Sequence, residues 1–251
     1  MGTTAPQPRV SRTMSMLWTP PGEEHTSQTG LTLAAIIDTA TAIADERGDT
    51  AVPLRAIGKR LGCSAMALYT YVDGKDELLD LMYDRAHREF GTAAPVSVIE
   101  WTERLLELYL AHPWLLDIAP ARPVLGPHQQ QAFELLLGTL VPYGFDRRDV
   151  VAIASSAYSL PAAAARTIVD ARRAGSAGED DGEPSWNPRL EALAAAAPDF
   201  AERFPLATGL GHAAPGGGVP SMEQAARENL RRSVELLVAG ASDREDSADA
   251  G

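Results

Sequence analysis

Basic side chains are concentrated in one short window of this chain, which suggests contact with phosphate groups. The window runs from residue 53 to residue 75, and its only acid is Asp73, against the cations Arg55, Lys59, Arg60 and Lys75. The whole chain, by contrast, has a formal net charge of -12 at pH 7. Ammonium and guanidinium groups bind phosphate oxygens, so a positive segment in an acidic protein predicts local contact with a nucleic-acid backbone. The alternative is that these cations are ordinary solvated surface groups.

The stretch SAMALYTY at residues 64–71 lies between these cations and offers side chains that suit DNA. Leu68 and Val72 follow Ser64 at intervals of four, so one helical stripe is expected to face the protein. Small and apolar side chains on the other faces suit base edges and thymine methyl groups, and hydroxyl groups suit phosphates. The predicted DNA-contacting residues are Arg55, Ser64, Ala65, Met66, Ala67, Tyr69, Thr70, Tyr71 and Lys75.

Two alternatives remain open for this stretch. Met66 or Tyr69 would instead pack into the core if the segment were an ordinary helical hairpin. The stretch also has no Arg, Asn or Gln, so it does not offer the bidentate hydrogen bonds that discriminate bases most strongly. Sequence preference would then depend on apolar contact, on DNA shape or on Arg55.

The periodicity of apolar residues predicts a helix-turn-helix around this stretch. Helices are expected over residues 31–48, 54–61, 65–71 and 75–90. Pro53 suits the first turn of the second helix, and Ser64 can cap the third. Gly62 would supply the turn between them, while Gly58 would let the two helices cross closely. Asp73-Gly74 is a turn signal before the fourth helix.

The rest of the chain is also expected to be helical, which makes the fold class all-α. Ala and Leu dominate, and runs of β-branched residues with period two are hard to find. Further helices are predicted over residues 98–111, 127–142, 146–174, 189–204 and 221–239, with an acidic loop at 175–187. The 251 residues suffice for a sizeable core in one large domain or two small ones.

Several functional classes are disfavoured by what the chain lacks. It has no nucleotide-binding glycine loop, no GxSxG and no HExxH, so an enzyme is not expected. His112, His128 and His212 do not have metal-ligand spacing, and we expect neither a metal nor another cofactor. The single cysteine, Cys63, fits a reducing compartment. No signal peptide and no membrane span are predicted, so the expected location is cytoplasmic, without a membrane partner.

Three segments of the chain resemble the TetR-type family of bacterial transcriptional regulators. The segments IIDTATAIADERG and RAIGKRLGCSAMALYTYVDGKDELLDLMYD are similar to the family's N-terminal DNA-binding domain. The segment ARPVLGPHQQQAFELLLGTLVPYGFDRRDVVAIASSAYSL resembles the C-terminal core of the tetracycline-repressor-like subgroup. The resemblance covers about residues 31–240. The domains are expected to be a flexible arm (1–30), a helix-turn-helix domain (31–74), a ligand-binding and dimerisation domain (75–240, with a connecting helix at 75–91) and a disordered acidic tail (241–251).

The resemblance implies a homodimeric repressor that leaves double-stranded operator DNA when a small hydrophobic or amphipathic effector binds. A dimer that uses the helices at 146–174 and 221–239 would form a four-helix bundle, and its two-fold symmetry implies a near-palindromic operator. Tyr69, Tyr71 and Lys75 match family positions that touch the DNA backbone. The alternative is a metabolite-binding or protein-interaction module of the same fold that has lost specific DNA binding.

An effector pocket should be apolar with a few converging polar groups. The candidates are Trp101, His112, Trp114, Arg122, His128, Phe133, Tyr158 and Arg166. Arg122 and the helix around Phe133 match pocket-lining regions of the family. For the aromatic residues the alternative is ordinary core packing. For Arg122 it is a structural ion pair, and for Arg166 a charge at the dimer interface.

Overall fold

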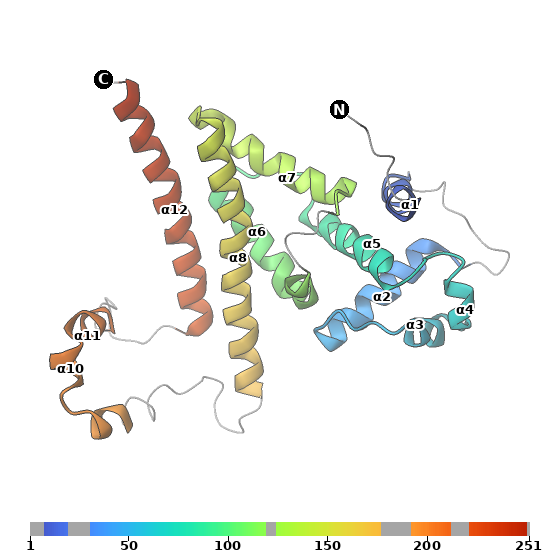
Figure 1. Ribbon diagram of the computed structural model, residues 1–251, viewed down its shortest axis with the longest axis horizontal. Coiled ribbons are helices and arrows are strands. Elements are labelled where there is room, and N and C mark those ends of the chain that lie inside the picture. Colours follow the sequence, from blue (N-terminus) through green and yellow to red (C-terminus); the bar gives the residue numbers. More distant parts are fainter. Residues whose placement is uncertain (1–7, 20–30, 119–123, 177–191, 212–220, 250–251) are drawn as a thin grey trace.

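The structure is a computed structural model, which describes residues 8–19, 31–118, 124–176, 192–211 and 221–249. All regular structure in these ranges is helical, which confirms the predicted all-α fold class. Figure 1 shows a cluster of short helices, α2 to α4, connected through α5 to a body in which the long helices α8 and α12 run side by side. Among the described helices, none is long and apolar enough to cross a membrane.

The N-terminal domain contains α2 (Leu33–Arg47), α3 (Leu54–Leu61) and α4 (Ala65–Leu68). Each helix contributes a large, fully buried side chain to its core, namely Ile36, Ile57 and Leu68. Each of these contributes about 1.5–3 kcal/mol through burial. The Thr32 hydroxyl caps α2 by accepting from Ala35 N, and Gly48 ends the helix with φ 67°.

The third helix is shorter than predicted, because it ends at Leu68 instead of continuing to Tyr71. Thr70 N donates to Ala67 O at 3.3 Å and Tyr71 N donates to Leu68 O at 2.9 Å, so the chain tightens into three-residue turns. The connecting element then runs as α5 (Lys75–His87) and a short 3₁₀ segment, η1 (Arg88–Phe90).

The body contains the remaining elements. They are α6 (Val98–Ala111), η2 (Pro113–Asp117), α7 (Pro127–Leu140), η3 (Val141–Tyr143), α8 (Arg147–Ser176), α10 (Phe200–Arg203), α11 (Pro205–Gly211) and α12 (Met222–Asp249). Side chains cap the starts of the two long helices: Asp146 accepts from Arg148 N and Asp149 N, and Ser221 accepts from Gln224 N. The predicted helix over 189–204 is interrupted before α10, and most of the predicted acidic loop at 175–187 lies outside the described residues.

The predicted disordered tail from residue 241 is wrong, because α12 continues to Asp249. The segment is rich in Ala, Asp and Glu, and it extends a helix that has already formed. Continuing a helix is much easier than nucleating one, so a polar end can remain helical without burying a core face.

The prediction of a flexible arm over residues 1–30 is also wrong in part, because α1 (Pro8–Leu17) is a helix that packs against α5. Leu17 is buried, and the Thr13 hydroxyl donates to Glu77 Oε1 at 3.1 Å. Arg12 pairs with Asp73 and donates to Tyr71 O at 3.0 Å. These contacts fix α1 on the turn that begins α5.

Removing the polar contacts of α1 should destabilise the protein, because Glu77 is only 8% exposed. Its carboxylate accepts hydrogen bonds from Thr13 and from Asp73 N, the latter at 2.6 Å, and forms an ion pair with Arg12. Leaving a buried carboxylate short of donors costs about 1–3 kcal/mol. We therefore expect the double variant R12A/T13V to lose about that much free energy of unfolding in urea. Arg47→Ala, which breaks an exposed pair with Asp49, should change it by less than about 1 kcal/mol.

Candidate DNA-binding surface and effector site

At the α3–α4 turn the two helices approach each other closely, as Gly58 and Gly62 predicted. A Cβ on Gly58 would lie 2.6 Å from the Cys63 carbonyl oxygen, so only glycine fits without a shift. Gly62 ends α3 with φ 69°, a left-handed conformation that favours glycine. Cys63 N donates to Gly58 O at 2.9 Å, and Ser64 Oγ caps α4 by accepting from Ala67 N at 3.2 Å. The turn therefore fixes the orientation of α4 on α3.

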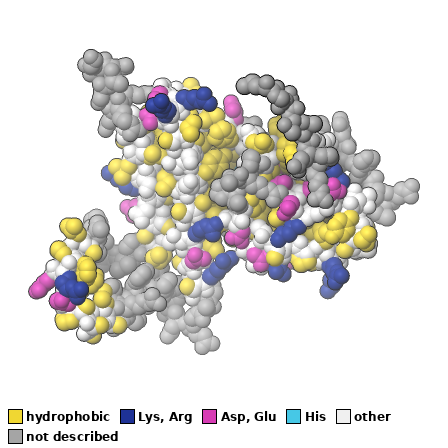
Figure 2. Space-filling model, in the orientation of Figure 1, with side chains coloured by type: hydrophobic (Ala, Val, Ile, Leu, Met, Phe, Trp, Pro, Cys, Tyr) yellow, Lys and Arg dark blue, Asp and Glu magenta, His cyan; other side chains and the backbone are white. Residues whose placement is uncertain are grey.

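The outer face of α4 is unusually apolar for an exposed surface. Met66 is 74% exposed and Tyr69 is 50% exposed, which rules out their packing into the core of the subunit. Ser64 and Thr70 are exposed beside them, while Ala65 and Ala67 are half-buried. Figure 2 shows hydrophobic side chains gathered at the α4 end of the molecule, with basic side chains nearby. Such a face can contact base edges and thymine methyl groups.

The predicted cations next to α4 are available to a partner. Arg55, Lys59 and Lys75 are exposed, and none of them forms a salt bridge with another described residue. Arg60 differs, because it pairs with Glu46 of α2 and thereby lowers the pKa of that carboxyl. Lys75 begins α5, so a phosphate there would meet both the Lys75 ammonium group and the positive end of the helix.

Tyr71 does not point outward as expected. It is half-buried, and its hydroxyl donates to Leu31 O at 2.9 Å. Its own carbonyl oxygen accepts from Arg12. The side chain turns inward because α4 ends early, and it connects the end of α4 to the start of α2. Contact between Tyr71 and DNA stays a prediction. In this structure the hydroxyl already donates a hydrogen bond within the protein.

Three of the predicted effector-binding residues come together in the body. Trp101 of α6 and Tyr158 of α8 meet edge to face with ring centroids 5.0 Å apart, and Phe133 of α7 lies 6.4 Å from Tyr158. Trp101 is fully buried and its indole N–H donates to Ala132 O at 2.8 Å, so its polar atom is already satisfied. Phe133 and Tyr158 are only half-buried and are better placed to meet a ligand.

Tyr83 and Tyr109, which were not among the predicted effector-binding residues, also belong to this part of the body. Burial raises the pKa of Tyr83 to about 12, and the charge of Asp84 adds to the effect. Burial also raises the pKa of Tyr109 and of Tyr158, and Tyr83 raises both further. The three tyrosines therefore lie in the same region of the body. None of them forms a hydrogen bond with another described residue, and Tyr109 is buried while Tyr83 and Tyr158 are half-buried, so each phenol group can accept a polar partner.

The remaining effector candidates do not join the tyrosines. His112 Nδ1 and Trp114 Nε1 each lie 2.7 Å from Asp45 Oδ1 of α2. Arg166 is exposed and donates to Leu116 O. Arg122 lies outside the described residues. The sequence predicted one pocket for all the candidates. In the structure these polar groups instead form hydrogen bonds between different elements, such as η2 with α2 and α8 with η2.

His128, the last of these candidates, takes part in a cap between α5 and α7. Asp84 of α5 is buried, and its Oδ1 accepts from His128 N at 3.0 Å and from Gln129 N at 2.9 Å. Its Oδ2 lies 2.7 Å from His128 Nδ1. A Cβ on Gly126 would overlap the Asp84 carboxylate, so glycine is needed there. The connecting helix therefore caps the first turn of α7.

His87 should make stability depend on pH. The imidazole is buried, burial lowers its pKa, and its Nδ1 lies 2.8 Å from Tyr83 O. The unfolded chain binds the proton more readily, so stability present above about pH 6.5 is lost as the pH falls towards 5. We expect His87→Phe to reduce this slope by up to about 1.4 kcal/mol per pH unit, measured by urea unfolding between pH 5 and 8. An unchanged slope would contradict this role for His87.

The surface shared by α8 and α12 offers an apolar face to a partner. Val151 of α8 and Leu236 of α12 are largely exposed. Between the helices lies a depression of ≈ 500 Å³, lined by Ser155, Ser156, Ser159, Leu160, Ser233, Leu236 and Leu237. The serines are small, so they allow another helix to approach closely.

Comparison with known proteins identifies a matching family model and curated relatives. Residues 36–82 match the family model for bacterial regulatory proteins of the tetR family. The HTH-type transcriptional repressor DrrR1 of Streptomyces coeruleorubidus is 35% identical over 150 residues, which cover 57% of this chain and 56% of the relative. An HTH-type transcriptional regulator of Saccharopolyspora erythraea is 30% identical over 142 residues, covering 54% of this chain and 60% of the relative. The matches therefore span little more than half the length of these curated relatives.

Solved structures match both domains. Apo ActR from Streptomyces coelicolor has a TM-score of 0.63 at 22% identity, covering 85% of this chain and 98% of its own. The complex of ActR with (S)-DNPA has a TM-score of 0.61 at 25% identity, covering 84% of this chain and 98% of its own. The transcriptional regulator SCO7222, a TetR from the same organism, has a TM-score of 0.61 at 22% identity, covering 85% and 98%.

Proposed function

Because this chain belongs to the TetR family of bacterial regulatory proteins, we propose that it represses transcription by binding operator DNA through α4 and leaves it when a small molecule binds the body. The observation that carries this proposal is the outer face of α4. It presents exposed Met66 and Tyr69 between unpaired cations, and the Gly58–Gly62 turn fixes its orientation. The family is one of regulators rather than enzymes.

In this proposal α4 enters the major groove, where Ala65, Met66 and Ala67 contact base edges. Arg55 and Lys75 lie on either side and bind phosphates, as does the hydroxyl of Tyr69. Lys59, another cation of the basic window, is exposed on α3 and adds a further phosphate contact. Without Arg, Asn or Gln on α4, apolar contact and DNA shape supply much of the sequence preference.

The proposed effector site lies at Tyr83, Tyr109 and Tyr158, next to Phe133. Three unpartnered phenol groups among aromatic rings suit a hydrophobic or amphipathic molecule with several oxygen atoms. ActR, which has the same fold, is described in complex with the small molecule (S)-DNPA, and this supports an effector site in the body. Tyr83 lies on α5, so an effector bound there contacts the connecting helix. The same helix begins at Lys75, which binds a DNA phosphate in this proposal.

The proposed functional unit is a homodimer formed through α8 and α12. Exposed Val151 and Leu236 and the serine-lined depression would be covered by the same helices of a second subunit. Two-fold symmetry then places two copies of α4 over successive major grooves, about 34–36 Å apart, on a near-palindromic operator. Effector binding moves α5 in each subunit and changes this spacing.

The proposal can be tested by fluorescence anisotropy with duplexes from the DNA that flanks the gene, in competition with unrelated DNA. At least one duplex should bind specifically, and its affinity should fall steeply with salt. Arg55→Ala and Lys59→Ala should each weaken binding and reduce the salt slope by about 1. Arg147→Ala, an exposed arginine at the start of α8, is the matched control and should have little effect. Failure of every flanking duplex to bind specifically would overturn the proposal.

A further inference from the structure

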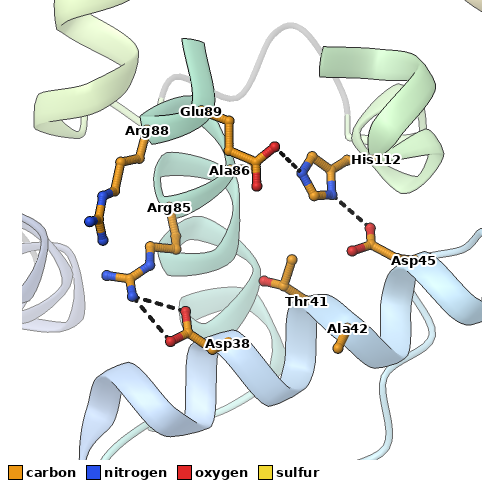
Figure 3. Close-up of a pocket in the computed structure, with 9 residues that line it drawn as sticks. All are labelled: Asp38, Thr41, Ala42, Asp45, Arg85, Ala86, Arg88, Glu89 and His112. Atoms are coloured by element: carbon orange, nitrogen blue, oxygen red, sulfur yellow. Dashed lines mark hydrogen bonds and ion pairs between the residues drawn. The ribbon is translucent and has the colours of Figure 1, made fainter. Parts of the chain in front are cut away.

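A polar pocket lies at the junction between the DNA-binding domain and the body, away from the tyrosine cluster. Its volume is ≈ 510 Å³. Figure 3 shows that α2 forms one wall, α5 and η1 form a second, and His112 closes the pocket from the body. Its lining residues are Asp38, Thr41, Ala42, Asp45, Arg85, Ala86, Arg88, Glu89 and His112.

His112 presents an unsatisfied nitrogen to this pocket. Its Nδ1 lies 2.7 Å from Asp45 Oδ1, which also accepts from Trp114 Nε1 at 2.7 Å. A carboxylate cannot donate, so Nδ1 carries the proton and the neutral ring leaves a lone pair on Nε2. Nε2 is buried without a hydrogen-bond partner among the described residues, and Glu89 Oε2 lies 3.3 Å away without hydrogen-bond geometry. In the neutral state, two acceptors therefore face each other.

The other groups that line the pocket also favour a ligand that donates hydrogen bonds. Thr41 Oγ1 is buried and has no hydrogen-bond partner in the described part of the chain. Arg85 is occupied by an ion pair with Asp38 at 3.0 Å. Three carboxylates line the pocket against two arginines, so the pocket favours a cation. The described residues hold no group of three or more metal ligands, so the structure offers no metal-binding cluster there.

We propose that this pocket binds a small organic ammonium ion, whose N–H groups donate to His112 Nε2, Glu89 and Thr41. A bound ammonium would connect α2 of the DNA-binding domain to η1 and to the body. It would therefore stabilise one arrangement of the two domains. This site is separate from the proposed effector site, and neither proposal depends on the other.

The test is calorimetric titration of the full chain with putrescine at constant ionic strength, with 1,4-butanediol as the uncharged analogue. We expect saturable binding of one putrescine per subunit and no binding of the diol. Either the absence of saturable putrescine binding or equal binding of the diol would overturn the proposal.

Variants of the lining residues test whether putrescine binds in this pocket. Two of them are used, so that the result does not depend on a single mutation. Glu89→Gln and Thr41→Val should each weaken putrescine binding, the former about tenfold because a charged hydrogen bond is lost. Glu46→Gln changes an exposed carboxyl of α2 outside the pocket and should leave the affinity unchanged. Circular dichroism of each variant checks that it is folded. Unchanged affinity in both folded pocket variants, or an equal loss in Glu46→Gln, would contradict the assignment.

Discussion

Replacing Gly58 with alanine should separate α3 from α4 and remove most of the DNA affinity. The added Cβ would lie 2.6 Å from the Cys63 carbonyl oxygen, and the backbone of Ser64 and Ala65 follows at 3.4 Å. Backbone atoms cannot rotate away as a flexible side chain can, so α4 must move. Forcing an extra methyl group into a packed site costs about 1–3 kcal/mol, and a displaced reading helix should lose more than tenfold in operator affinity.

Gly138→Ala is the matched control for this prediction. Gly138 lies inside α7, and nothing comes within 4 Å of its added Cβ apart from the helix itself. Alanine is the better helix former, so this variant should gain about 0.5–1 kcal/mol of stability and bind DNA normally. Both variants are measured by urea unfolding and by DNA anisotropy. If Gly58→Ala were as stable and as active as Gly138→Ala, the close crossing of α3 and α4 would not matter for DNA binding.

Replacing Asp84 with alanine should detach α7 from the connecting helix. The variant leaves the N–H groups of His128 and Gln129 without their buried acceptor and removes the carboxylate beside His128 Nδ1. Losing a helix cap costs about 1 kcal/mol and unpairing buried polar groups costs more, so we expect a loss of about 3 kcal/mol in urea unfolding. Hydrogen exchange should speed up in the first turn of α7.

His128→Ala separates the two parts of this contact. Its side chain is 41% exposed, so the imidazole–carboxylate pair is largely screened by water and should contribute under about 1 kcal/mol. The backbone cap on Asp84 remains in this variant. If His128→Ala were as destabilising as Asp84→Ala, the side-chain pair rather than the helix cap would hold α7 to α5.

The helix-turn-helix could be predicted from sequence because short-range rules determine it. Gly58, Gly62 and Ser64 have local roles that depend only on neighbouring backbone, and the structure confirms all three. The unpaired state of Arg55 also matches its predicted exposure. The orientation of Tyr71 was not predictable in this way, because its partner Leu31 is 40 positions away in sequence.

The helix α1 escaped prediction for a similar reason. Its segment has few apolar residues, and its stability depends on contacts with the start of α5 that no local pattern reveals. The effector site was predicted only in part. Aromatic type identified Tyr158 and Phe133, whereas Tyr83 belongs to the connecting helix, and only packing brings it into the same region as Tyr109. The histidines were selected by type, while their real partners, Asp45 and Asp84, lie on distant helices.

The most direct test of the account is selection of bound sequences from a random duplex library by the purified protein. The account predicts enrichment of one near-palindromic sequence, with half-site centres a whole number of helical turns apart, as two copies of α4 in a symmetric dimer require. It also predicts that Gly58→Ala enriches nothing under the same conditions. Recovery of no consensus by the wild-type protein, or of a single site without two-fold symmetry, would contradict it.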